Sequence, residues 1–131
     1  MEQKSHPFVI RSKIWIADQD EQIVFGLGRY RILECVHRRG SLQAAAQELK
    51  MSYRAVWCRI KATEERLQRD LLIRSNNGSK LTPFALKLLK QFRRLHAVVE
   101  TESDAMFQEL MADSMTEPME AETDAPEKSK K

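Results

Sequence analysis

The residues from Ser52 to Lys61 combine side chains that are suited to binding nucleic acid. Ser52, Tyr53 and Arg54 are consecutive, and Trp57 and Lys61 follow at intervals of three and four residues. A guanidinium can donate paired hydrogen bonds to a guanine edge or a phosphate, and hydroxyl groups commonly bind phosphate. An indole ring offers an apolar face to thymine methyl groups or sugars. We therefore expect these five residues to form a DNA-binding surface.

Four of these five residues also have a simpler interpretation. Ser52 fits the first capping position of a helix, where its hydroxyl would bind a backbone amide. Arg54 and Lys61 are also typical of ordinary solvated helix surfaces, and Trp57 could pack partly into the core. Their position at the start of a second helix favours contact with DNA, because recognition helices usually present base-reading residues from that end.

The surrounding pattern predicts a helix-turn-helix. Ser41 is a good N-cap for a short helix over residues 42–49, and the three alanines at 44–46 allow another helix to approach closely. A brief turn at residues 50–51 leads to a longer helix over about 53–69. A short helix, a tight turn and a longer helix are the parts that this motif requires. A helical stripe of apolar and small residues predicts the core-facing side of the longer helix: Val56, Ile60, Thr63 and Leu67.

Two short hairpins flank the helices. Residues 13–17 and 23–26 predict the first hairpin, which precedes a helix that ends near Gly40. Residues 71–75 and 80–82, joined by a turn at 76–78, predict a second hairpin, the wing. Arg74, Asn77 and Lys80 in the wing are expected to contact phosphate, although a solvated turn would carry the same residues. Arg38 and Arg39 are better explained as charges that favour a helix C-terminus.

A long helix is expected to follow Thr82-Pro83, a pair typical of a helix start. Its apolar stripe has no obvious partner in so small a domain, so we expect it to pair with the same helix of a second copy. The residues expected at this homodimer interface are Phe84, Leu88, Phe92, Leu95 and Val99.

The expected fold is therefore mainly α with short β-hairpins: a winged helix-turn-helix with a long C-terminal dimerisation helix. Residues 1–11 are expected to be a flexible leader, 12–82 the DNA-binding domain and 83–111 the dimerisation helix. Residues 112–131, which are acidic and aperiodic, are expected to be disordered.

Charge is divided unevenly along the chain. Residues 1–100 carry 19 Lys/Arg and 10 Asp/Glu, whereas residues 101–131 carry 3 and 9. A basic body indicates a polyanionic partner, which we expect to be double-stranded DNA.

Several classes of protein are not expected. No apolar run approaches the length of about 20 residues that a membrane helix needs, and we expect a cytoplasmic protein. Neither cysteine belongs to a metal-binding pair, the histidines are far apart, and no catalytic triad or phosphate-binding glycine loop is present. We therefore expect no metal site, no cofactor and no enzymatic activity. Cys35 and Cys58 are expected to be buried thiols, with a single disulfide as the alternative.

Four sequence blocks together resemble the N-terminal DNA-binding domain of ModE-type molybdate-responsive regulators, and more distantly that of LysR-type regulators. The match covers about residues 12–95, and the block from Met51 to Trp57 is its most specific part. The four blocks are Phe25-Gly26-Leu27-Gly28-Arg29, Gly40-Ser41-Leu42 with Ala44-Ala45-Ala46, Met51-Ser52-Tyr53-Arg54-Ala55-Val56-Trp57, and Leu81-Thr82-Pro83-Phe84.

The resemblance implies a winged helix that dimerises through its last helix and binds a palindromic operator. It also implies that Ser52, Tyr53, Arg54 and Trp57 lie on the recognition helix. The sequence has no room for the C-terminal molybdate-binding domains of ModE proteins, so we expect no direct binding of molybdate. The alternative function is a winged helix that binds another protein without specific DNA binding, since a fold does not by itself determine function.

Overall fold

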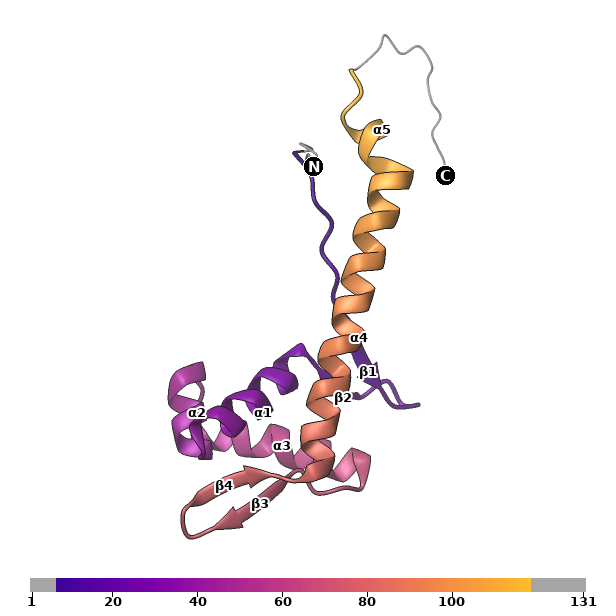
Figure 1. Ribbon diagram of the computed structural model, residues 1–131. Coiled ribbons are helices and arrows are strands. Elements are labelled where there is room, and N and C mark those ends of the chain that lie inside the picture. The colour runs from indigo at the N-terminus through magenta and orange to yellow at the C-terminus, as the bar shows by residue number, and fades with distance from the viewer. Residues whose placement is uncertain (1–6, 119–131) are drawn as a thin grey trace. The chain divides into compact units, whose positions relative to one another are not determined.

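The computed structural model describes residues 7–118, which divide into two units. One unit runs from Ser12 to Val99, and the other joins residues 7–11 to residues 100–118. The first unit contains the strands β1 (Trp15–Ala17) and β2 (Ile23–Gly26), helices α1 (Leu27–Arg39), α2 (Leu42–Leu49) and α3 (Tyr53–Leu67), strands β3 (Leu72–Ser75) and β4 (Gly78–Leu81), and most of α4 (Pro83–Phe107). Figure 1 shows this mainly helical architecture with its two antiparallel strand pairs, so the expected fold class is confirmed.

Local sequence signals fix where these helices begin and end. The Ser41 hydroxyl accepts the Ala44 amide at the start of α2, and the Ser52 hydroxyl accepts the Ala55 amide at the start of α3, both at 3.0 Å. Gly40 ends α1 in a left-handed conformation, with φ of 84°, and donates its amide to a carbonyl of the helix. These caps satisfy backbone groups that a helix end leaves unpaired.

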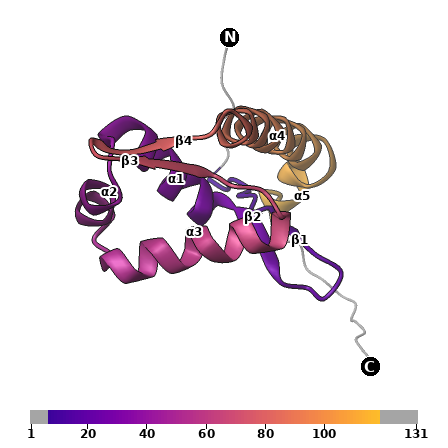
Figure 2. The ribbon, with the colours of Figure 1, turned by 90° about the horizontal axis from the view of Figure 1, so that it is seen from below.

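The core of the Ser12–Val99 unit lies where α1, α2 and α3 meet. Val56, Ile60 and Thr63 on α3 are buried as expected, and Leu67 is partly buried against the same core. Thr63 satisfies its buried hydroxyl by donating to the Arg59 carbonyl at 3.0 Å. Figure 2 shows α1 between α3 and the wing hairpin of β3 and β4.

The wing is joined to the turn between α1 and α2. The Ser79 amide donates to the Gly40 carbonyl at 3.0 Å. Gly78 lies directly beside that carbonyl, has a φ of 120°, and leaves no space for a Cβ atom. The β3 end of the hairpin is held by Glu64 of α3, whose carboxylate accepts the Leu71 and Leu72 amides at 2.7 and 3.3 Å. The wing is therefore anchored at both of its ends.

The first half of α4 packs into the same core. One residue that was expected at the dimer interface is therefore buried within its own chain. Phe92 is only 2% exposed, and its ring meets Phe25 edge-on at 5.2 Å and Tyr30 at 5.9 Å. Phe84 and Leu88 are partly buried against the core. A periodic stripe shows that a helix has an apolar face, but it does not show what covers that face. Phe92 therefore belongs to the core of its own chain.

The second unit consists of a short N-terminal segment and the continuation of the long helix. After α4, a π-helical turn over Gln108–Ala112 leads to the short helix α5 (Asp113–Met115). Ile10, Met106 and Phe107 are among the residues that line a hollow of about 320 Å³ within this unit. Helical structure thus continues past residue 111, where the loss of periodicity predicted disorder, and Ala112 is 1% exposed. The remainder of the expected acidic tail from residue 119, and leader residues 1–6, lie outside the described residues.

Candidate nucleic-acid interface

The turn between α2 and α3 positions the candidate site. α2 ends at Leu49, Lys50 adopts a left-handed conformation, and the Met51 amide donates to the Ala46 carbonyl at 3.0 Å. Ser52 then caps α3, so its hydroxyl is already engaged by a backbone amide. Because α3 buries one side in the core, the residues at other angles around its first turns face solvent.

Tyr53, Arg54 and Trp57 form the exposed start of α3. Tyr53 is 46% exposed and Trp57 is 38% exposed, so the alternative in which Trp57 packs into the core is not observed. The three side chains line a hollow of about 270 Å³. Large aromatic side chains are usually buried. An exposed aromatic pair that lines a hollow is therefore a candidate contact surface.

A hydrogen bond joins the wing to this surface. Arg74 of β3 donates from Nη2 to the Tyr53 hydroxyl at 3.1 Å. Asn77 and Lys80 are exposed on the same hairpin. The structure therefore links Arg74 to Tyr53, which the sequence could not reveal because the two residues are 21 positions apart.

Lys61 is already paired within the protein. Its ammonium forms an ion pair with Glu64 at 3.1 Å and lies 5.7 Å from the centre of the Trp57 ring. Among the described residues, Arg54, Arg74 and Lys80 form no ion pair. The surface thus has three unneutralised cations and one that a carboxylate compensates.

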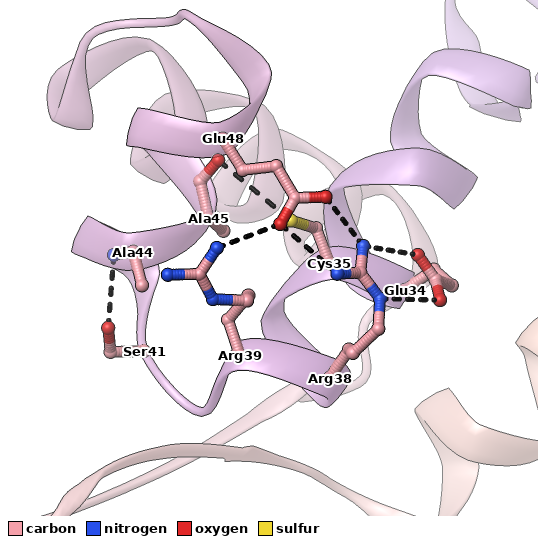
Figure 3. Close-up of polar contacts among 8 residues, drawn as sticks. All are labelled: Glu34, Cys35, Arg38, Arg39, Ser41, Ala44, Ala45 and Glu48. Carbon is pink, nitrogen blue, oxygen red and sulfur yellow. Dashed lines mark hydrogen bonds and ion pairs between the residues drawn. The ribbon is translucent and has the colours of Figure 1, made fainter.

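Figure 3 shows a charged cluster that joins α1 to α2. Both terminal nitrogens of Arg38 donate to Glu48, at 2.7 and 3.1 Å, while Arg38 also pairs with Glu34 at 3.3 Å. Arg39 donates to the same Glu48 at 2.9 Å. These hydrogen bonds lower the pKa of Glu48 to about 2 and raise that of Arg38. Arg38 and Arg39 are thus occupied within the protein, in agreement with a structural role.

A second group of arginines was not singled out from the sequence. Arg29 of α1 donates from Nε to the Thr63 hydroxyl at 2.9 Å, and burial together with Arg66 and Arg59 lowers its pKa. Arg66 donates to the Ile23 carbonyl at 2.6 Å. No short-range sequence pattern connects these residues, because α1, α3 and β2 bring them together only in the folded chain.

The two cysteines differ in their environments. Cys35 is buried, and burial raises the pKa of its thiol, with the nearby Glu48 adding to the effect. Cys58 is exposed on α3, so the expectation that both thiols are buried is wrong. It lies two residues after the buried Val56, on a different face of the helix. The two thiols are free, as the main interpretation expected.

The described residues contain no group of three or more side chains suited to holding a metal ion. Within the same part of the chain, every helix is too short or too polar to cross a membrane.

The part of the chain that carries this site is similar to known proteins. The family model for bacterial regulatory helix-turn-helix proteins of the lysR family matches residues 27–86. The HTH-type transcriptional regulator YofA of Bacillus velezensis is 37% identical over 82 residues, which are 60% of this chain and 28% of that protein. The molybdenum transport protein ModE of Azotobacter vinelandii is 26% identical over 87 residues, 63% of this chain and 32% of that protein. The chain therefore spans about a third or less of the length of these two relatives.

Solved structures give the same result for the fold. The DNA-binding domain of CbnR in complex with DNA has a TM-score of 0.54 and 26% identity, and the match covers 63% of this chain and 94% of that chain. CbnR itself, a LysR family transcriptional regulator, has a TM-score of 0.52 and 26% identity, and the match covers 60% of this chain and 27% of that chain. Residues 27–86 are therefore similar, in sequence and in fold, to the helix-turn-helix DNA-binding domain of LysR-type transcriptional regulators.

Proposed function

We propose that this protein binds specific double-stranded DNA and regulates transcription by inserting the start of α3 into the major groove. The observation that carries the proposal is the exposed group of Tyr53, Arg54 and Trp57 at the N-terminal end of the second helix of the motif. Recognition helices read bases from that end. The similarity to a domain solved in complex with DNA supports this assignment.

In this proposal the residues divide between base reading and backbone contact. Arg54 reads a base edge or grips an adjacent phosphate, while Ser52 and Tyr53 contact the backbone near the start of the helix. Arg74, Asn77 and Lys80 of the wing contact flanking phosphates. Lys61 has a smaller role, because Glu64 already compensates its charge. These assignments give the DNA-binding set Ser52, Tyr53, Arg54, Trp57, Lys61, Arg74, Asn77 and Lys80.

We further propose that two copies pair through one side of α4 and bind a palindromic site. Leu95 is 46% exposed and Val99 is partly exposed, so both are available to a second chain. Phe84 and Leu88, only partly buried, line a hollow of about 410 Å³ together with Pro83 and other residues. Exposed leucine and valine on a helix surface are stabilised when a second helix covers them.

We also propose that the protein is a ModE-like regulator. Its residues bind DNA and do not bind molybdate. The four sequence blocks and the 26% identity to a ModE protein support the first part. The similarity extends over only 32% of that relative, which leaves molybdate binding to be tested directly.

A selection experiment tests the proposal. Genomic DNA fragments retained by the protein are sequenced, and affinity for the recovered site is measured by fluorescence anisotropy at two salt concentrations, with and without molybdate. We expect a palindrome whose binding weakens with salt and does not respond to molybdate. No enrichment over random fragments would support the protein-interaction module instead, and a shift caused by molybdate would contradict the expectation that the protein does not bind molybdate directly.

A further inference from the structure

The hollow at the start of α3 has features that point to a particular base. Tyr53 and Trp57 lie one helical turn apart, so their rings are neighbours on the same face of the helix. Both remain 38–46% exposed although each has a large apolar area that folding could have buried. With Arg54, they line a space of about 270 Å³.

Contacts from the wing and from α3 itself engage both aromatic side chains. The Tyr53 hydroxyl accepts a hydrogen bond from Arg74 of the wing at 3.1 Å. The Trp57 ring has the Lys61 ammonium 5.7 Å from its centre, and Glu64 holds that lysine at 3.1 Å. The hollow is therefore formed before any ligand arrives, and this reduces the conformational entropy that binding would cost.

The chemistry of the major groove restricts what can fill an apolar hollow on a recognition helix. Base edges there present hydrogen-bond donors and acceptors, and the 5-methyl group of thymine is the apolar exception. Arg54 also lines the hollow. Its guanidinium can bind a phosphate or a base acceptor of the DNA next to the two aromatic rings. Phosphate alone would not explain why two aromatic rings are kept exposed beside the arginine.

We propose that the hollow of Tyr53, Arg54 and Trp57 receives the 5-methyl group of a thymine, and that Trp57 is the specificity-determining residue for that position. This inference rests on the proposed DNA-binding function and adds the identity of one base. Trp57 selects thymine over cytosine by burying a methyl group that cytosine lacks. Tyr53, fixed by Arg74, forms the opposite wall.

The test replaces each thymine of the selected DNA site, one at a time, by deoxyuridine. This exchange removes only the methyl group and leaves base pairing and the O4 acceptor unchanged. Affinity for each substituted duplex is measured by fluorescence anisotropy with the full chain. We expect one position in each half-site to bind about fourfold more weakly, the effect of losing one buried methyl group.

Variants connect the methyl effect to the hollow. In Trp57→Ala, thymine and deoxyuridine at the sensitive position should bind equally, whereas Trp57→Phe should keep part of the difference. Trp15→Ala is the matched control, because Trp15 is 53% exposed in β1 and lies outside the hollow. This control should keep the full difference.

The outcomes separate the inference from the proposed function. A selected site whose affinity is indifferent to every thymine-to-deoxyuridine exchange would overturn the thymine assignment alone. The Trp57→Ala variant is checked for folding by comparing its circular dichroism spectrum with that of the parent. If the folded variant still binds thymine more tightly than deoxyuridine, Trp57 is not the specificity-determining residue. Failure to select any DNA sequence would overturn the proposed function and this inference together.

Discussion

Single side chains decide how the α3 surface meets its partner. Arg54 stands out because it is exposed at the start of α3 and no described carboxylate neutralises it, whereas Lys61 shares its charge with Glu64. A cation without an internal partner loses no existing ion pair when it binds an anion. Arg54 is therefore the residue whose removal tests the interface most directly.

Replacing this side chain, in Arg54→Ala, should weaken binding to the selected site by about 1–3 kcal/mol and relax specificity at one position. Fluorescence anisotropy with the cognate duplex and with single-base variants provides the measurement. Arg31→Ala removes an equal charge from an exposed position of α1 and serves as the control. Affinities that are equal in the two variants would contradict the base-reading role of Arg54.

Acid should destabilise the protein partly through Glu48. Hydrogen bonds from Arg38 and Arg39 lower the pKa of this carboxyl from its usual range to about 2. The stabilisation is therefore complete above the unfolded pKa of about 4.3 and is lost as the pH falls towards 2. Glu48→Gln should lower stability near neutral pH and flatten the decrease between about pH 5 and 2, as measured by urea unfolding. Glu65→Gln, at an exposed position of α3, should leave the slope of that decrease unchanged.

At the scale of elements, the wing depends on a close approach between two backbone segments. Gly78 combines a φ of 120° with a position against the Gly40 carbonyl, and both features oppose a side chain. Gly78→Ala should therefore destabilise the fold by about 1–3 kcal/mol in thermal unfolding. Gly28→Ala is the contrasting substitution, because a Cβ at this helical glycine meets nothing within 4 Å. The stability of the Gly28→Ala variant should be unchanged or slightly higher. An equal loss of stability in both variants would contradict the proposed role of Gly78 in the wing.

The exposed side of α4 carries the prediction about assembly. Leu95→Glu places a charge on the face proposed to meet a second copy, where burial would leave it unpaired. We expect the dimer to dissociate at concentrations where the parent is dimeric, as measured by light scattering after size-exclusion chromatography. Ala97→Glu adds the same charge at an exposed position on the opposite side of the helix and should remain dimeric. A Leu95→Glu protein that stays dimeric would place the interface elsewhere.

For the whole molecule, the uneven charge distribution predicts a strong dependence of DNA binding on salt. Each phosphate contact releases counterions, which gives a slope of about −0.9 per contact in a plot of log affinity against log salt. Lys80→Ala should reduce the slope by about 1 and weaken all sequences to a similar extent, because a phosphate contact carries no base information. Titrations at four salt concentrations measure this slope. A change in sequence preference without a change in slope would assign Lys80 to base reading.

The sequence predicts most of the elements between Ser12 and Val99 and several of their ends. The caps Gly40, Ser41 and Ser52, the core stripe of α3 and both hairpins follow from short-range chemistry, in which each residue satisfies neighbouring backbone groups or faces one side. The exposed start of α3 follows from the same periodicity, because a helix that buries one stripe must present the others to solvent.

Which partners these elements meet depends on how distant parts of the chain pack together. Phe92 lies in its own core because Phe25 and Tyr30 come from other elements. The Glu64 carboxylate on α3 accepts backbone amides at the base of the wing, a contact between separate elements. The contact of Arg74 with Tyr53 and the joint binding of Glu48 by Arg38 and Arg39 also depend on how hairpins and helices pack. Periodicity specifies which way a side chain faces along its own element. What it faces is set by the packing of residues distant in the chain, and no local pattern contains that information.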